Sequence, residues 1–124
     1  MNSFDIDGVI YIRKGLMGVR PGPKDVIITG RSFEEEEETI DMLEFHGIYN
    51  RVYFNPLKFD EKTRESSGAH KAKTLNSLKE QGYDIQVHFE DDPVQIAVIK
   101  KLAPWVAIVH LDHDLTYKEN MRHV

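Results

Sequence analysis

Four short polar segments of this 124-residue chain carry the side chains best suited to chemistry. They are Asp5-Ile6-Asp7-Gly8, Thr29-Gly30-Arg31, Lys71 and Glu90-Asp91-Asp92. Carboxylate oxygens suit a hard divalent cation, and a lysine is suited to neutralising phosphoryl oxygens. We therefore expect a bound cation to neutralise the aspartates, provided that the fold brings these segments together.

The elements between these segments predict how they are positioned. Short β-rich apolar runs alternate with helix-like stretches, a pattern typical of a mainly parallel sheet covered by helices. We predict an α/β fold, a Rossmann-like three-layer sandwich with a mainly parallel five-stranded sheet. The predicted strands are 3–6, 26–29, 51–55, 85–89 and 105–111, with 9–13 as one arm of a hairpin. Loops at the carboxyl ends of such strands converge on one crevice, where functional groups gather.

Three helices are predicted between the strands. The first begins at Ser32, which forms a capping-box pattern with Glu35, and ends at Gly47. Its core-facing residues are expected to be Phe33, Ile40 and Leu43. The second covers 70–81, where apolar residues recur on one face, and the third covers 94–102. Residues 56–68 are predicted to form a loop. The last dozen residues are charged, and we expect them to form a partly frayed tail.

In their order along the chain, the four segments resemble the motifs of the haloacid dehalogenase-like (HAD) superfamily of phosphatases. The resemblance spans nearly the whole chain. FDIDGV is similar to the first motif, in which two aspartates are separated by one residue. This implies that Asp5 is the nucleophile that attacks phosphorus and becomes an aspartyl phosphate. It also implies that Asp7 protonates the leaving oxygen and later activates water.

VIITGR looks like the second motif, and SGAHKAKTL resembles the third. The second motif implies that Thr29 and neighbouring backbone N–H groups, such as that of Gly30, bind a phosphoryl oxygen. Arg31 could contact the leaving group. From the third motif we expect Lys71 to be the phosphate-binding lysine, because it begins a predicted helix, with Lys73 as the alternative.

His70 could contact the substrate, although a solvent-exposed histidine is the simpler interpretation. VHFEDDP resembles the fourth motif, an apolar strand that runs into acidic metal ligands, with Glu90 where glycine is common. Mg²⁺ prefers oxygen ligands and keeps several waters, so Asp5, the backbone carbonyl of Asp7 and Asp91 would suffice to bind it. Asp92 is expected to be an outer or a direct ligand. The cofactor implied is Mg²⁺, and the implied reaction is hydrolysis of a phosphomonoester.

The spacing of the motifs predicts a minimal domain. Only about 20 residues separate Asp7 from Thr29, too few for a hairpin and a full helix. Neither this stretch nor 56–68 has room for a cap domain, so we expect one domain over 1–124 with an open site. An open site favours bulky substrates, such as a nucleotide, a nucleic-acid end or a phosphoprotein. We favour a nucleotide or polynucleotide end phosphate, because several basic residues could line one rim. These are Arg31, Lys58, Lys62, Arg64 and Lys71.

Composition excludes several other classes. A net charge of −5 argues against a large basic face for duplex nucleic acid. The chain has no cysteine, so disulfides, thiolate metal sites and a cysteine nucleophile are excluded. No apolar run approaches the roughly 20 residues of a membrane helix, and the first ten residues do not form a signal peptide. A cytoplasmic protein without a membrane partner is expected.

Three alternatives stay open at this point. A phosphorylatable signalling receiver also uses aspartates, threonine and lysine around Mg²⁺, but it carries them in a different chain order. A catalytically idle binding module could keep the same fold. His110, Asp112 and Asp114 would share one face of a strand and, with His113, could form a second metal site. A polar strand end or a solvated tail explains these residues more simply.

Overall fold

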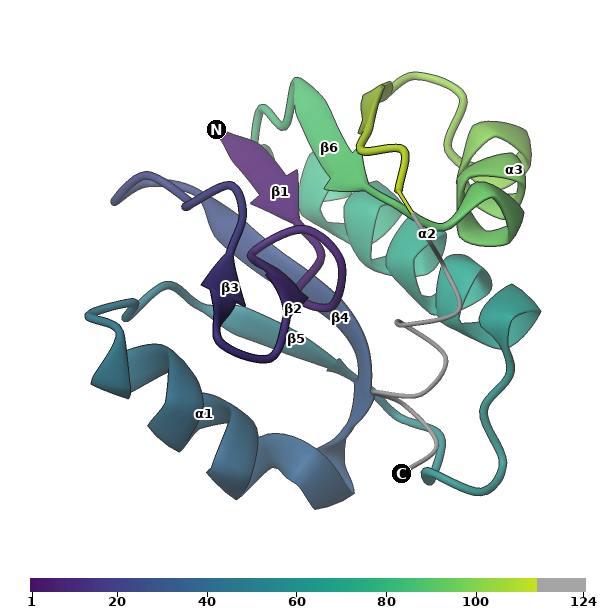
Figure 1. The fold of residues 1–124 in the computed structure, drawn as a ribbon. Helices are drawn as coiled ribbons and strands as arrows, with labels where there is room; N and C mark the ends of the chain where they lie inside the picture. The colour runs from purple at the N-terminus through teal and green to yellow at the C-terminus, as the bar shows by residue number, and fades with distance from the viewer. Residues whose placement is uncertain (114–124) are drawn as a thin grey trace.

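The computed structural model describes residues 1–113, which form one parallel sheet with helices on both faces (Figure 1). The strands are β1 (Asn2–Phe4), β2 (Tyr11–Arg13), β3 (Leu16–Met17), β4 (Val26–Ser32), β5 (Val52–Asn55), β6 (Val87–Glu90) and β7 (Ala107–His110). The helices are the 3₁₀ turn η1 (Phe33–Glu35), α1 (Glu36–Phe45), α2 (Arg64–Glu80) and α3 (Pro93–Leu102). The predicted charged tail lies almost entirely outside the described residues.

The sheet has the strand order β5-β4-β1-β6-β7, and all four pairings in it are parallel. β2 and β3 form a separate antiparallel hairpin, which confirms the hairpin expected near residues 9–13. Figure 1 shows α2 and α3 on one side of the sheet and α1 on the other. The predicted α/β class with a Rossmann-like three-layer arrangement is confirmed.

Alternation along the strands divides the apolar core into two layers. Val26 and Ile28 pack in the layer formed with α2 and α3, whereas Ile27 packs in the layer that contains Leu43 of α1. Successive side chains of a strand point to opposite faces, which explains this division. The same rule decides which way the polar side chains at the strand ends point.

The second helix begins earlier than the sequence indicates, because α2 starts at Arg64 and not at His70. The prediction of a loop over 56–68 is therefore wrong for its last five residues. Thr63 caps the helix by accepting a hydrogen bond from the N–H of Ser66 (3.0 Å). The first two turns lack large apolar residues because α3 packs closely there. A Cβ atom on Gly68 would lie only 2.9 Å from the Cβ of Val98.

The first helix follows the capping prediction but not the whole core prediction. Glu35 accepts a hydrogen bond from the N–H of Ser32 (2.7 Å), as a capping box requires. Leu43 is buried, and Ile40 is partly buried. Phe33, however, is 57% exposed, which corrects the expectation that it faces the core. It belongs to η1, whose tighter winding puts it out of phase with the apolar face of α1.

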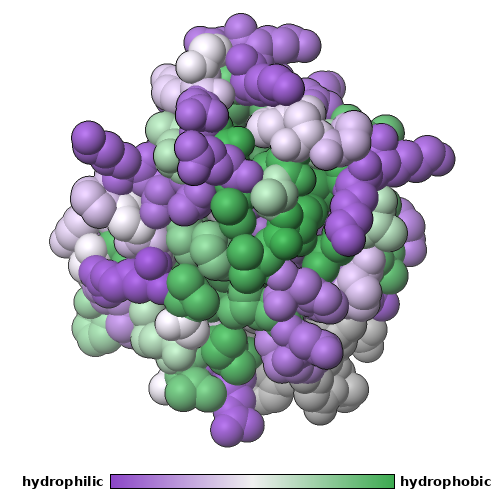
Figure 2. Space-filling model, turned by 90° about the horizontal axis from the view of Figure 1, so that it is seen from above, coloured by the Kyte–Doolittle hydropathy of each residue, from purple (hydrophilic) through white to green (hydrophobic). Residues whose placement is uncertain are grey.

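Some large apolar side chains remain exposed in the described part of the chain. They include Met1, Leu102 and Val109. Figure 2 shows apolar residues gathered in the middle of the surface that is seen from above. Over residues 1–113, no helix combines the length and the apolar character that crossing a membrane requires.

Candidate functional site

The polar segments meet at the carboxyl ends of β1 and β6, which are neighbours in the centre of the sheet. The chain leaves β1 towards β4 on one side, and it leaves β6 towards β7 on the other side. Such a change of direction opens a crevice beyond the strand ends, the usual place for a ligand in an open α/β sheet. Asp5 directly follows β1, and its N–H donates a hydrogen bond to the carbonyl of Phe89 in β6 (3.1 Å).

Three carboxylates are buried together at this point. Asp5, Glu90 and Asp91 each offer one oxygen atom, and these atoms all lie within 4.8 Å of one another. No more than 1% of any of the three residues is exposed. Carboxylates buried so closely repel one another unless cations compensate their charge. Within residues 1–113 this is the one group of three acidic or histidine side chains that could hold a metal ion.

Lys71 of α2 contacts two members of this cluster. Its Nζ atom lies 3.0 Å from Asp5 Oδ1 and 2.7 Å from Glu90 Oε1, and the side chain is fully buried. Leu75 and Leu78 share its buried helix face at spacings of four and seven residues. Lys73 lies on another face of the helix and is exposed. The lysine beside Asp5 is thus Lys71, as expected, although it lies in the middle of α2 and not at the start of a helix.

A chain of buried hydrogen bonds supports Glu90 from behind. Glu90 Oε1 lies 3.1 Å from His88 Nε2, and His88 Nδ1 lies 2.7 Å from the hydroxyl of Ser3. Because a carboxylate only accepts hydrogen bonds, Nε2 donates to Glu90, and a neutral imidazole then accepts at Nδ1 from Ser3. Ser3 and His88 are partners in the parallel register of β1 and β6. Ser3, Asp5, His88 and Glu90 therefore share one sheet face, towards Lys71.

This chain of polar residues was missed in the sequence, although a signal for it exists. The strand predicted over 3–6 and β6 carry polar residues at every second position, Ser3 and Asp5 in one and His88 and Glu90 in the other. That spacing places each pair on one face of its strand. Glu90 precedes the expected metal ligands in the sequence, but no role was predicted for it. In the structure it lies within the cluster.

Asp7 is not a member of this group of three carboxylates, and Arg31 binds it. The guanidinium donates two hydrogen bonds to it, from Nε to Oδ2 (3.0 Å) and from Nη2 to Oδ1 (2.7 Å). Burial on its own would lower the pKa of Arg31, but the charge of Asp7 and these hydrogen bonds raise it above its usual value. Arg31 also donates to the hydroxyl of Thr39 on α1 (3.1 Å). In this structure, Arg31 therefore contacts the expected proton donor.

Asp92 has several structural partners. Arg64 donates two hydrogen bonds to its carboxylate (3.0 and 2.6 Å), and Gln95 donates a third (3.0 Å). The N–H of Val94 donates to Asp92 Oδ1 (2.9 Å), so Asp92 also caps α3. Glu90, and not Asp92, lies with Asp5 and Asp91 in the cluster.

Gly8 lets the loop after β1 lie directly against Asp91. Its φ angle is +86°, and a Cβ atom there would lie 2.0 Å from Asp91 Oδ2. Both features require glycine, because other residues rarely adopt this φ angle and have no room for a side chain here. The aspartate, any residue, aspartate, glycine segment is thus fixed to the end of β6 by its glycine.

Two histidines, His110 at the end of β7 and His113 after it, border the same loop. His113 Nε2 donates to the carbonyl of Gly8 (2.8 Å) and lies 3.3 Å from Asp91 Oδ2. His110 Nε2 donates to the backbone carbonyl of Asp91 (3.1 Å). These contacts attach the end of β7 to the site. Asp114, a member of the second metal site considered above, lies outside the described residues.

The expected phosphate-binding segment lies within the second half of β4, which pairs with β1 on the side away from β6. Thr29 is fully buried, and its hydroxyl accepts a hydrogen bond from the N–H of Arg31 (3.1 Å). The carbonyl of Gly30 accepts one from Lys62 Nζ (3.1 Å). Thr29 and Gly30 are thus held at the edge of the sheet where Asp5 lies.

His70 is partly buried, which corrects the expectation of an exposed histidine. Its Nε2 atom donates to the carbonyl of Tyr53 (3.4 Å). Burial, assisted by the positive charge of Lys71, lowers the pKa of His70 to about 4, although hydrogen bonds to the backbone of Tyr53 and Thr29 oppose the shift. His70 is therefore neutral at neutral pH.

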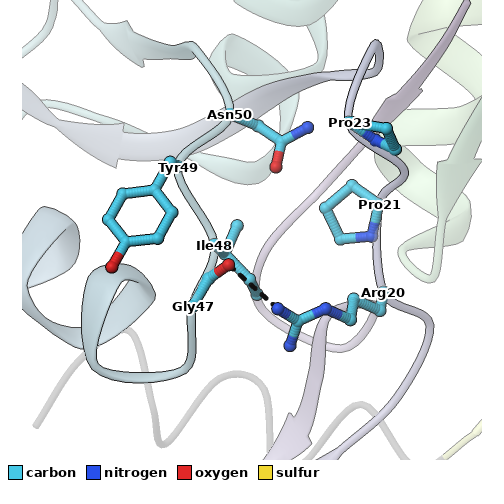
Figure 3. A pocket seen from close by; sticks show the side chains of 7 residues that line it. All are labelled: Arg20, Pro21, Pro23, Gly47, Ile48, Tyr49 and Asn50. Carbon is cyan, nitrogen blue, oxygen red and sulfur yellow. Dashed lines mark hydrogen bonds between the residues drawn. The ribbon is translucent and has the colours of Figure 1, made fainter.

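A hollow of about 320 Å³ lies at the opposite edge of the sheet (Figure 3). Arg20, Pro21, Pro23 and residues 47–50 line it, and these segments precede β4 and β5. Arg20 donates hydrogen bonds to the carbonyls of His46 and Gly47 (2.8 and 2.9 Å), which directly follow α1. Asn50 donates to the carbonyls of Gly22 and Asp25. Arg20 and Asn50 thus bind backbone carbonyls around this hollow, and none of the four polar segments singled out in the sequence lines it.

Comparison of the chain with protein-family models, with curated proteins and with solved structures found no match in any of the three.

Proposed function

We propose that this chain is a Mg²⁺-dependent phosphomonoesterase of the HAD-like type, with Asp5 as the nucleophile. The observation that carries the proposal is the position of the Asp5 carboxylate. The carboxylate is buried beyond the carboxyl ends of β1 and β6, 3.0 Å from Lys71 and in one cluster with Glu90 and Asp91. A buried carboxylate beside a lysine and other acidic groups suits a reaction in which positioning and charge neutralisation do most of the work.

The cluster fits a divalent cation by its chemistry. All of its ligand atoms are carboxylate oxygens, the type that Mg²⁺ prefers. Lys71 supplies one positive charge to three carboxylates, and a divalent cation would add two more. Asp5 and Asp91 are the proposed ligands, with Glu90 as a ligand or as the partner of Lys71. When bound, Mg²⁺ would neutralise the phosphoryl oxygens and so reduce their repulsion of the nucleophile.

The proposed reaction has two steps. In the first, Asp5 attacks phosphorus, the bond from phosphorus to the ester oxygen breaks, and the leaving oxygen takes a proton from Asp7. In the second, Asp7 accepts a proton from water as that water attacks phosphorus, which releases inorganic phosphate and restores the Asp5 carboxylate. Lys71 and the Thr29–Gly30 segment would hold the phosphoryl oxygens during both steps.

Arg31 constrains this scheme. Its two hydrogen bonds favour the carboxylate form of Asp7, whereas the first step requires Asp7 to carry a proton. We therefore propose that Arg31 leaves Asp7 when substrate binds and contacts the leaving group instead. The expected contact between Arg31 and the leaving group then becomes a condition for the acid role of Asp7.

The direct test is hydrolysis of a generic aryl phosphate with and without Mg²⁺. We expect release of phosphate in Mg²⁺, none in EDTA, and loss of activity in Asp5→Asn. Asp41→Asn, which changes an exposed aspartate on α1, is the matched control and should keep full activity. Full activity of Asp5→Asn would rule out this mechanism.

A further inference from the structure

Most of the basic residues that were expected to line one rim of the site form ion pairs within the protein or are buried. Arg31, Lys62 and Arg64 pair with acidic side chains at 2.7, 2.7 and 2.6 Å. Lys71 is fully buried, and Lys58 is exposed. These cations therefore do not form a continuous strip along which a nucleic-acid backbone could bind.

Exposed apolar side chains border the site instead. Phe33 directly follows β4, and Leu57 and Phe59 follow β5, so all three lie at the carboxyl edge of the sheet. Their exposed fractions are 57%, 37% and 37%. We refer to the two phenylalanines among them, Phe33 and Phe59, as the aromatic rim. Exposed rings beside a proposed phosphate site could gain from being covered by an apolar or aromatic part of a ligand.

Contacts hold both rings of the aromatic rim in place. The ring of Phe33 packs against that of buried Phe54, with 5.7 Å between centroids. The N–H of Phe59 donates a hydrogen bond to Glu34 (2.9 Å), which ties the loop after β5 to η1. Rings that are already positioned lose little freedom when they bind a ligand.

Lys62 connects the aromatic rim to the phosphate-binding segment. Its Nζ atom lies 5.0 Å from the centroid of the Phe59 ring and 3.1 Å from the carbonyl of Gly30. A ligand held at Thr29 and Gly30 therefore has an aromatic face nearby, with a cation beside that face. Stacking against aromatic side chains is a common way for proteins to hold a nucleobase, and it works with every base.

From this arrangement we propose that the aromatic rim stacks a nucleobase, so that the substrate is a nucleotide or the terminal nucleotide of a short strand. The inference rests on the proposed function, because it assumes that the phosphate of the same nucleotide lies at Asp5. A phosphate and a planar base joined by a sugar match a phosphate site and an aromatic surface on adjoining segments. Selectivity would then depend on the base more than on charge.

The test compares a nucleoside 5′-monophosphate with ribose 5-phosphate, which lacks only the base. We expect kcat/KM to be about 5- to 150-fold higher for the nucleotide, the range that stacking of one base gives. Phe59→Leu and Phe33→Leu should remove most of this preference and leave hydrolysis of ribose 5-phosphate within about twofold of wild type. Phe45→Leu, at an exposed aromatic at the other end of α1, is the matched control and should change neither.

A 5′-phosphorylated oligonucleotide as a third substrate separates the two sources of a terminal nucleotide. Equal hydrolysis of ribose 5-phosphate and the nucleotide would overturn the inference. So would an equal loss on both substrates in Phe59→Leu, or a clear preference for a phosphopeptide. Calorimetric binding of the nucleotide and of ribose 5-phosphate to Asp5→Asn in Mg²⁺ tests the aromatic rim without turnover. Binding that depends on the base and on Phe59, without hydrolysis by the wild type, would refute the proposed reaction and support the aromatic rim.

Discussion

Replacement of Lys71 by methionine should destabilise the fold by about 3 to 5 kcal/mol, the effect of removing one partner from a buried ion pair. Methionine keeps most of the apolar length of lysine, so the change isolates the charge. Lys71 Nζ lies 3.0 Å from Asp5 and 2.7 Å from Glu90, and all three side chains are fully buried. Without the lysine, both carboxylates and the neighbouring Asp91 keep their mutual repulsion.

Urea denaturation followed by circular dichroism measures this effect. With an m value of about 1.5 kcal/mol per M, the midpoint should fall by about 2 to 3 M. Lys73→Met is the matched control, because Lys73 lies on the same helix and is exposed. It should change stability by no more than about 0.5 kcal/mol. Mg²⁺ should restore part of the stability of Lys71→Met, since the cation would neutralise the same carboxylates.

A loss below about 1 kcal/mol in Lys71→Met would refute this reasoning, because that value is typical of an exposed ion pair. It would mean that the carboxylates of Asp5 and Glu90 do not depend on the lysine for compensation. Absence of any rescue by Mg²⁺ would separately contradict the idea that lysine and metal act on one cluster.

Three further predictions follow from the geometry of the site. Gly8→Ala and Gly15→Ala both place alanine at a positive φ angle (+86° and +81°), so both should strain the backbone. Only Gly8 adjoins Asp91, so only Gly8→Ala should abolish Mg²⁺-dependent activity in a phosphate-release assay. Saturating Mg²⁺, at about 100 times its Kd, should raise Tm by about 10 °C in wild type and far less in Asp91→Asn by scanning fluorimetry; equal shifts would contradict the assigned ligand. The lowered pKa of His70, about 4, means that the unfolded chain takes up this proton first as pH falls. Stability should therefore drop between pH 6.5 and 4 by up to about 3 kcal/mol, and urea titrations should show a flatter pH dependence in His70→Gln. An unchanged pH dependence would contradict the assignment.

The local features of the fold could be predicted from the sequence. Central parallel strands are buried on both faces, so they are continuous apolar runs such as Val26-Ile27-Ile28. Such a run can be recognised in the sequence without knowing which strands lie beside it. The capping box at Ser32 depends on residues three positions apart, and it was predicted correctly. The strand ends also indicated which edge of the sheet carries the polar segments, because parallel strands share that edge.

Contacts between distant segments could not be predicted in the same way. The first turns of α2 were missed because Gly68, and not a large apolar residue, faces α3. A small residue at a close helix contact carries no apolar period. Similarly, the exposure of Phe33 depends on where the 3₁₀ turn ends and α1 begins.

The candidate site shows the same division. The sequence by itself determined that Asp5 and Asp91 stand at strand ends, because that information is local, whereas the expected position of Lys71 at the start of a helix was wrong. Only the tertiary structure decided that Glu90 joins them and that Arg31 holds Asp7. These side-chain contacts depend on strand register and on how the helices pack against the sheet. Both are determined by contacts between residues far apart in the chain. Side-chain types therefore predict which groups are available, whereas packing decides which of them meet.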